Sequence, residues 1–174
     1  MIRTKRLIIR LIESQDIEQV RKLHNHPETL KWLSDTHSVT RVEQESWFKR
    51  ISTSLTSRRY VVELCETGHL VGVFRLDDID MENKSAYVGL DISIDFRRKG
   101  FALETYEAMI PFLFEELQLN RLSLITLETN HPAVSLYEKL GFIKEGILRQ
   151  AFYRETGYVN GLVYSKLSIE NLKK

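Results

Sequence analysis

The chain has 174 residues, of which 43% are hydrophobic and 28% are charged, and its formal net charge at pH 7 is +1. This length allows one domain with a sizeable core, so we expect residues 1–174 to form a single domain. A charge so close to zero argues against nucleic acid or an anionic membrane as the main partner, because such binding needs a large basic excess. The single cysteine excludes an intrachain disulfide framework. With no signal-peptide or membrane-spanning pattern, we expect a cytoplasmic protein.

The first half of the chain predicts a strand, two helices and three further strands. A short β-branched run at 6–12 favours a strand, and 13–25 has apolar residues at helical spacing behind Ser14, its expected N-cap. A turn-rich connector leads to a second helix at 41–55. Strand-like runs follow at 60–66, 70–79 and 85–94, and Gly68 between the first two is typical of a tight hairpin.

The second half predicts a long helix at 100–118, which Pro111 should kink. A strand at 121–128 and a short helix at 131–140 follow, and the helix should end at Gly141. Two last strands, at 142–153 and 158–168, are joined by a turn. This order predicts an α+β fold with a mixed, mostly antiparallel sheet and helices on both faces. The strands at 85–94 and 121–128 flank a helical crossover and should therefore be parallel.

Residues 95–100, DFRRKG, lie where a predicted strand ends and a predicted helix begins. Free backbone N–H groups and the positive end of the helix dipole converge at such a turn, and a glycine lets the main chain approach a ligand closely. A pyrophosphate would fit there, with cationic side chains to reach its outer oxygens. A solvated surface turn is the alternative at this point. The chain has no GxGxxG or GxxxxGK[ST] loop, which disfavours dinucleotide and nucleoside-triphosphate chemistry.

A second pattern follows about thirty residues later, with Asn130 at a strand end and Tyr137 about two turns into the next helix. Taken alone, Asn130 would cap this helix and Tyr137 would pack in the core. Together the two patterns read Arg97-x-x-Gly100-x-Ala102 and Asn130-x-x-Ala133-x-x-x-Tyr137. This pair resembles the GCN5-related N-acetyltransferase (GNAT) family. The opening TKRLIIRLIESQD is similar to the branch with ribosomal-protein N-acetyltransferases and spermidine acetyltransferase.

The resemblance implies the GNAT fold and acetyl-CoA as the acetyl donor. In that fold the strands at 85–94 and 121–128 splay, and the pantetheine arm lies in the gap and pairs with a strand edge. Backbone amides of the basic turn would hold the pyrophosphate. The expected cofactor-binding residues are Ile92, Ser93, Ile94, Arg97, Arg98, Lys99, Gly100, Phe101, Ala102, Asn130 and Ala133.

The resemblance also implies an enzyme in which a primary amine attacks the thioester directly within a ternary complex. Tyr137 would then be the catalytic acid that protonates the coenzyme A thiolate. Many relatives carry a glutamate in a stretch like AEIGY, where this chain has Tyr87. The general base is therefore left open between Asp91, Glu128 and an ordered water.

The acceptor is left open among a polyamine, an amino-sugar nucleotide and a protein N-terminal amine. HNHPETLKW is similar to the amino-sugar-nucleotide acetyltransferases of pseudaminic-acid biosynthesis, whereas RYVVE and the last hairpin are similar to spermidine acetyltransferase. We expect Trp32, Tyr87 and Glu128 to contact the acceptor. The acidic run RLDDID at 75–80 would suit a polycation, or is a solvated strand end.

No metal site is predicted, because the histidines of the 24–37 connector lie in a turn beside Pro27 with no cysteine to join them. Assembly into a homo-oligomer is left open. A non-catalytic module of the same fold, which senses acetyl-CoA or binds a partner, is the main alternative, and the presence of Tyr137 argues against it. A nucleic-acid clamp at 97–99 is disfavoured by the near-zero charge.

Overall fold

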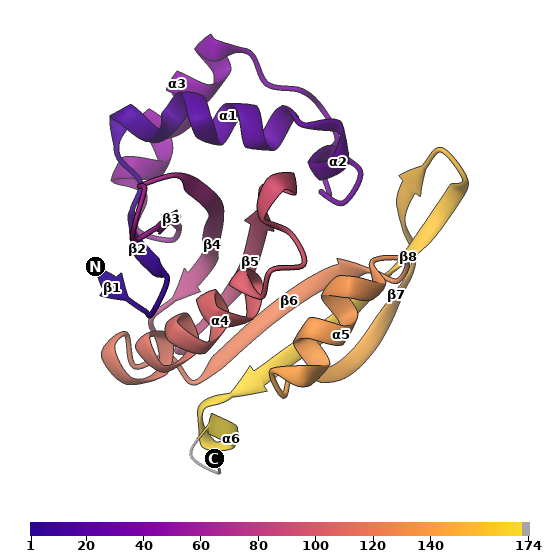
Figure 1. Cartoon of the computed structure of the whole chain (residues 1–174). Coiled ribbons are helices and arrows are strands. Elements are labelled where there is room, and N and C mark those ends of the chain that lie inside the picture. Colours follow the sequence, from indigo (N-terminus) through magenta and orange to yellow (C-terminus); the bar gives the residue numbers. More distant parts are fainter. Residues whose placement is uncertain (172–174) are drawn as a thin grey trace.

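One mixed sheet organises residues 1–171, the part of the chain that this computed structural model describes (Figure 1). Its strands lie in the order β1-β2-β3-β4-β5-β6-β8-β7. Neighbouring strands are antiparallel except β5 and β6, which are parallel. This confirms the α+β fold with a mixed, mostly antiparallel sheet. The strands are β1 Ile2–Arg3, β2 Leu7–Leu11, β3 Arg58–Leu64, β4 Leu70–Asp80, β5 Ser85–Ile92, β6 Arg121–Leu127, β7 Ile143–Arg154 and β8 Gly157–Leu167.

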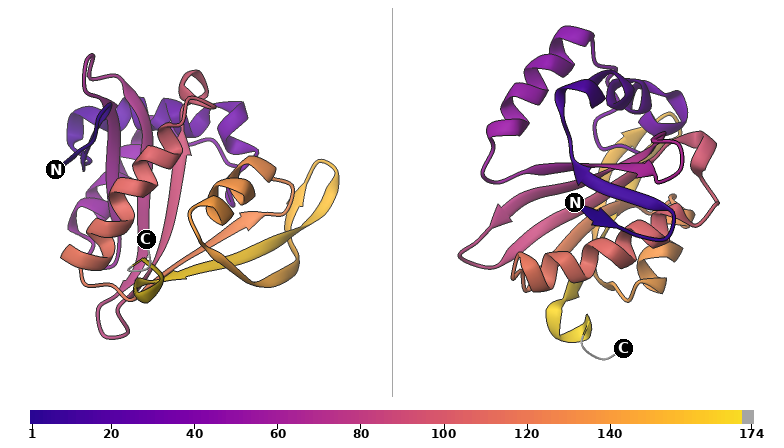
Figure 2. Two further views of the ribbon diagram at one scale, coloured as in Figure 1. Left: turned by 60° about the horizontal axis from the view of Figure 1, so that its bottom comes forward. Right: turned by 60° about the vertical axis from the view of Figure 1, so that its left-hand side comes forward.

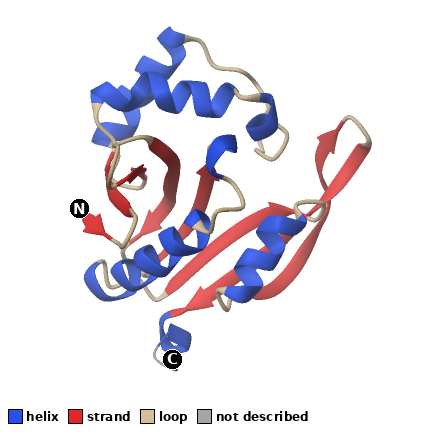
Figure 3. Ribbon diagram, in the orientation of Figure 1, coloured by secondary structure: helices blue, strands red, loops and turns tan. Residues whose placement is uncertain are grey.

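Helices cover both faces of the sheet (Figures 2 and 3). Helices α1 and α3 lie on one face, over the N-terminal strands, and α4 and α5 lie on the other. Among residues 1–171, no helix is long and apolar enough to cross a membrane. The helices are α1 Ile17–Asn25, α2 Pro27–Leu30, α3 Arg41–Thr53, α4 Phe101–Pro111, α5 His131–Lys139 and α6 Ser168–Asn171.

The main core lies between the sheet and the α4–α5 layer. Phe74 of β4 packs edge to face on Tyr106 of α4, with ring centroids 5.4 Å apart, and Tyr106 packs in the same way on Tyr137 of α5 at 5.9 Å. Because successive residues of a strand point to opposite faces, Val73 lies on the other side of β4, where it packs with Val20 of α1. Side chains on the Val73 face of β4 and β5 therefore belong to the α1 side of the sheet.

Strands β5 and β6 part from each other soon after they meet. They pair only from Ser85 opposite Arg121 to Tyr87 opposite Ser123. Beyond that point β5 continues to Ile92 and β6 continues to Leu127, and the two strands no longer pair with each other. The expected splay is confirmed, and it leaves one edge of β5 free for a ligand.

Three local expectations differ from the structure. Helix α1 is preceded by a 3-10 turn, Ser14–Asp16, whose N-cap is Glu13, and the N-cap of α1 itself is Asp16 rather than Ser14. At Pro111 the predicted long helix changes type: α4 ends there, and the chain continues as a π-helical turn, Phe112–Glu116. Strand β1 and helices α2 and α6 were not predicted, because two to four residues are too few to show a hydrophobic period.

Candidate active site

The turn between β5 and α4 forms a cradle of backbone amides. A 3-10 turn, Ile94–Phe96, follows β5, and then Arg98 (φ 59°) and Gly100 (φ 82°) adopt left-handed conformations. The first hydrogen bond of α4 runs from Glu104 N to Gly100 O, so the amides of the preceding turn have no partner within the helix. A helix N-terminus of this kind favours an anion, and the predicted pyrophosphate fits it.

Arg6 supports this cradle from behind. It donates to Lys99 O at 3.0 Å, forms an ion pair with Glu104 at 2.6 Å, and places its guanidinium 4.3 Å from the centroid of the Phe101 ring. A surface pocket lies beside it, lined by residues 4–6 and one side of α4. Sequence reasoning missed Arg6, because no local pattern relates positions 6 and 104.

The cations of the turn have different roles. The Arg97 guanidinium donates to Ile92 O and Glu28 O, both at 2.9 Å, and to Thr29 Oγ1 at 3.2 Å. It therefore ties α2 to the end of β5 and does not point into the cradle. Arg98 and Lys99 are exposed, and Lys99 Nζ lies 5.6 Å from the centroid of the Phe96 ring. These two side chains are the ones placed to reach outer phosphate oxygens.

The expected pantetheine contacts lie along the gap between β5 and β6. Ile92 pairs with Gly72 of β4, and Ser93 N donates to Val71 O, so hydrogen bonding to β4 uses one edge of this segment. The other edge has no partner strand and is available for an added strand. On the β6 side, Asn130 Oδ1 accepts from Ala133 N at 3.4 Å and caps α5, which is the structural role expected of it.

Tyr137 is buried in α5, with 9% of its surface exposed. Its ring packs on Tyr106, Phe142 and Tyr164 at centroid distances of 5.9, 5.9 and 6.3 Å. Burial raises the pKa of the Tyr137 phenol above its ordinary value, although the Tyr106 hydroxyl and the Arg75 guanidinium oppose this. The phenol is therefore protonated at neutral pH, as a proton donor must be. Burial also raises the pKa of Tyr106, whose Oη has no well-formed hydrogen bond within residues 1–171.

The expected acceptor residues are spread over three elements, and no contact joins them. Trp32 follows α2 and carries Lys31 Nζ 5.3 Å from its ring centroid. Tyr87 of β5 is 42% exposed. Glu128 follows β6 and accepts from the backbone N and from Nδ2 of Asn160, both at 3.0 Å, so its carboxylate is held rather than simply solvated.

On the α1 side of β4 and β5, Asp91, one of the candidate bases, forms a charge pair with Arg75, a residue that was not predicted for the site. Arg75 Nε is 3.4 Å from Asp91 Oδ2. Asp91 pairs with Val73 in register, and Tyr87 lies four residues before it on the same face. Asp91 is thus on the side of the sheet where Tyr87 is exposed. Only the register of β4 against β5 brings Arg75 to Asp91, and the sequence does not give that register.

The other sites considered from sequence are occupied by internal contacts. Asp77 forms an ion pair with Arg59 at 2.7 Å, and Asp80 accepts from both nitrogens of Asn83 at 2.8 and 2.7 Å. Within the described residues, no group of three or more histidine, cysteine or acidic side chains is arranged to hold a metal ion.

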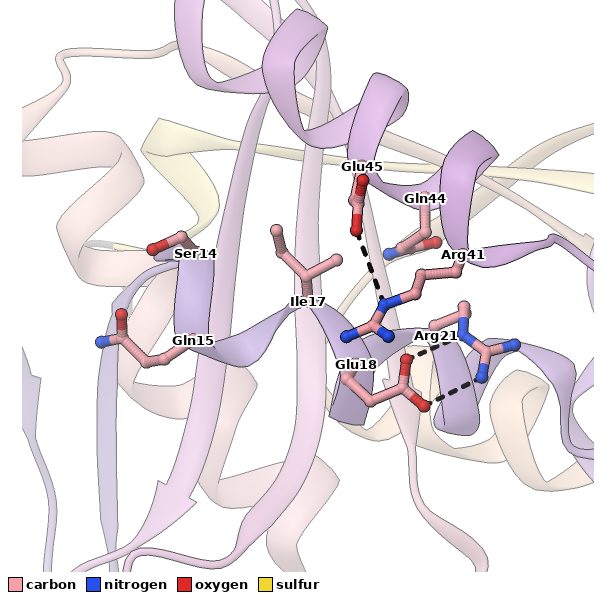
Figure 4. Close-up of a pocket in the computed structure, with 8 residues that line it drawn as sticks. All are labelled: Ser14, Gln15, Ile17, Glu18, Arg21, Arg41, Gln44 and Glu45. Atoms are coloured by element: carbon pink, nitrogen blue, oxygen red, sulfur yellow. Dashed lines mark hydrogen bonds and ion pairs between the residues drawn. The ribbon is translucent and has the colours of Figure 1, made fainter.

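A surface pocket between α1 and α3 lies outside this region (Figure 4). Its charged side chains pair with each other: Arg21 with Glu18 at 2.9 Å, and Arg41 with Glu45 at 3.5 Å. None of its lining residues belongs to the turn between β5 and α4 or to α5, so the pocket is separate from the cradle and from Tyr137.

Comparison with known proteins agrees with this geometry. The family description of the acetyltransferase (GNAT) domain matches residues 6–143. The uncharacterized N-acetyltransferase p20 of Bacillus licheniformis is 31% identical over 150 residues, 84% of each chain. Spermidine N(1)-acetyltransferase of Escherichia coli K12 is 28% identical over 154 residues, covering 88% of this chain and 82% of that one.

A solved structure shows the same likeness in three dimensions. Spermidine N-acetyltransferase of Vibrio cholerae, in complex with CoA and spermine, superimposes with a TM-score of 0.92 at 25% identity and covers 98% of this chain and 100% of its own. The chain belongs to the GNAT acetyltransferase family and is an acetyl-CoA-dependent N-acetyltransferase.

Proposed function

We propose that the enzyme acetylates the primary amine of a small molecule, with Tyr137 as the catalytic acid and the 98–102 amides as the pyrophosphate site. The observation that carries this proposal is the buried, protonated phenol on the α5 side of the gap between β5 and β6. A proton donor there can serve a thiolate leaving from a ligand that lies along the free edge of β5.

Bound acetyl-CoA supplies an activated thioester, from which the acetyl group passes to the amine nitrogen while the carbon–sulfur bond breaks. The chain supplies the rest. Backbone amides and exposed cations at the cradle hold the anionic end, and the β5 edge orients the arm. Tyr137 donates its proton to the departing sulfur and regains one from solvent or the amine. Residues 85–92 also offer N–H groups along the gap to polarise a carbonyl.

Three classes of amine are candidates for the acceptor. The E. coli and V. cholerae relatives are named for spermidine, which supports a polyamine. An amino-sugar nucleotide rests on the HNHPETLKW segment, and a protein N-terminal amine is the third candidate. We also propose a homo-oligomer, since the V. cholerae enzyme is described in a dodecameric form.

Thiol release from acetyl-CoA over a panel of amines tests the proposal. The panel contains polyamines, UDP-amino sugars, amino acids and N-terminal peptides, and the acetylated amine is identified by mass spectrometry. We expect release that depends on both acetyl-CoA and one class of amine. A chain that binds acetyl-CoA but acetylates no member of the panel would instead support a non-catalytic acetyl-CoA-binding module.

A further inference from the structure

Arg75 lies on β4 directly opposite Gly89 of β5. A Cβ at position 89 would be 2.7 Å from Arg75 Nη2 and 3.0 Å from its Cζ and Nε, so the guanidinium covers the strand where a side chain would stand. Gly89 is two residues beyond Tyr87, the last residue of β5 that pairs with β6. Arg75 therefore covers β5 at the level where the gap opens, and the missing side chain of Gly89 makes room for it.

The Arg75 guanidinium has unused hydrogen-bond donors. Its Nε is shielded from solvent and has no hydrogen-bond partner within residues 1–171. Asp91 Oδ2, at 3.4 Å, provides charge but no hydrogen bond, and 36% of the Arg75 side chain is exposed. A guanidinium has five N–H groups in a planar fork that matches a carboxylate or a phosphate. Donors with no internal partner, beside the gap, are suited to an anion brought by a ligand.

This charge is close to the reaction centre. Arg75 lies on the α1 side of β4, on the same face as Val73, whereas Tyr137 belongs to the opposite layer. Its positive charge nevertheless opposes the rise in the Tyr137 pKa, which places the guanidinium within electrostatic reach of the catalytic acid. The two strands part at this level, just beyond Tyr87.

The acidic side chains around Arg75 are poorly suited to a polycation. Asp91 is paired with Arg75 itself, and Asp77 is paired with Arg59. A polyamine needs carboxylates whose charge is not already offset. Arg75, by contrast, keeps an Nε–H group that no hydrogen bond uses within residues 1–171, although Asp91 offsets its charge.

We propose that Arg75 binds an anionic group, a carboxylate or a phosphate, carried by the acceptor amine. Gly89 gives the guanidinium its place and Asp91 orients it, so Arg75 is a specificity-determining residue for the acceptor. The inference rests on the proposed function and narrows it: the acceptor is an amine with an anionic group a few bonds away, such as an amino acid or an amino-sugar nucleotide, and not a polyamine.

Matched acceptor pairs test the role of Arg75. An amino acid is compared with its carboxamide, and a UDP-amino sugar is compared with the free amino sugar. These two pairs separate recognition of a carboxylate from recognition of a phosphate. Spermidine represents the polycations. We expect the wild type to prefer the anionic member of at least one pair, in kcat/KM, by about tenfold or more. Arg75→Gln should remove that preference mainly by raising acceptor KM, with acetyl-CoA KM within about twofold. Arg75→Lys should keep part of the preference, because lysine retains the positive charge but not the planar set of N–H donors.

Two further variants keep the test decisive. Arg50→Gln makes the same charge change on the exposed part of α3. It should leave the ratio of kcat/KM between the anionic and the neutral acceptor of each pair unchanged. If Arg75→Gln fails to fold, Gly89→Ala provides a second test, since its Cβ displaces the guanidinium without removing the charge. Two results would overturn the inference: a wild-type preference for spermidine, or the same ratio of kcat/KM between anionic and neutral acceptors in wild type and Arg75→Gln. Either result would still be compatible with the proposed N-acetyltransferase activity. Thiol release from acetyl-CoA in the absence of any amine would instead contradict the proposed function.

Discussion

Tyr137 is the residue on which the proposed chemistry depends most directly. Its ring is fixed by three aromatic neighbours, so Tyr137→Phe removes one hydroxyl and leaves the packing in place. We expect kcat to fall by at least about tenfold while acetyl-CoA affinity is unchanged, because the lost group acts only on the leaving thiolate. Steady-state kinetics, with acetyl-CoA binding measured by calorimetry, checks both parts. Tyr60→Phe is the matched control: this buried phenol packs on Phe74 and Phe112 rather than on Tyr137, and we expect a smaller loss of kcat.

The pH profile tests whether Tyr137 keeps its proton over the working range of the enzyme. Burial raises the pKa of Tyr137 above its ordinary value of about 10, so the group is protonated, and able to donate, throughout the range below that pH. Activity should therefore rise with pH as the acceptor amine loses its proton, and should not fall between about pH 7 and 9.5 through loss of this acid. A descending limb near neutral pH that vanishes in Tyr137→Phe would contradict the assignment, since it would require a lowered pKa.

Helix α2 is held at both ends by arginines from distant parts of the chain. Arg97, in the basic turn, binds Glu28 O and Thr29 Oγ1. Arg154, at the end of β7, donates to Lys31 O at 3.4 Å and also to Leu33 O. The four-residue helix therefore joins the cofactor turn to the last hairpin, the two regions between which the acceptor should lie (Figure 1). A helix this short has little stability of its own and depends on these contacts.

Arg97→Gln should loosen α2 without emptying the cradle. We expect faster amide hydrogen exchange over residues 27–33 and a several-fold rise in acceptor KM, with acetyl-CoA KM nearly unchanged, because the Arg97 side chain bonds to α2 and to Ile92 O. Exchange mass spectrometry and kinetics measure the two effects. Arg98→Gln, one residue on and exposed, should do the reverse: acetyl-CoA KM rises and exchange in α2 stays as in wild type. Equal effects from both variants would show that the two arginines share one role.

Sequence reasoning succeeded where the signal is local. The strand–turn–helix at 85–110 and the capped helix after Asn130 each carry their own pattern of alternation, glycine and cap, and the structure confirms these elements. It failed where partners are far apart in the chain. Arg97 belongs to the first sequence pattern, yet the Arg97 side chain bonds to α2, about seventy positions earlier in the chain. Arg75 was not singled out, because its importance comes from the cross-strand register that sets it over Gly89.

At the scale of the whole molecule, the sheet consists of two halves that share few backbone contacts. Strands β1–β5 and β6–β8 meet in the sheet only at three residue pairs, from Ser85 to Tyr87 on β5. A ligand that pairs with the free edge of β5 and also contacts α5 would connect the two halves. Bound acetyl-CoA should therefore protect amides along Val88–Ile92 from hydrogen exchange, and also stabilise the fold against heat.

The stabilisation has an expected size and a matched glycine control. At about one hundred times Kd, ligand binding adds about 2.7 kcal/mol, which for a chain of this length corresponds to a rise in Tm of about 5–10 °C. Gly100→Ala and Gly68→Ala both force alanine into a left-handed backbone (φ 82° and 68°), and neither Cβ meets an atom closer than 3.4 Å. Both variants should lower the Tm of the free protein by a similar amount, because the strain is the same. Only Gly100→Ala should also lose most of the rise with acetyl-CoA, because in that variant the backbone strain falls on the turn whose amides hold the pyrophosphate. A rise in Gly100→Ala equal to that in Gly68→Ala would place the pyrophosphate elsewhere.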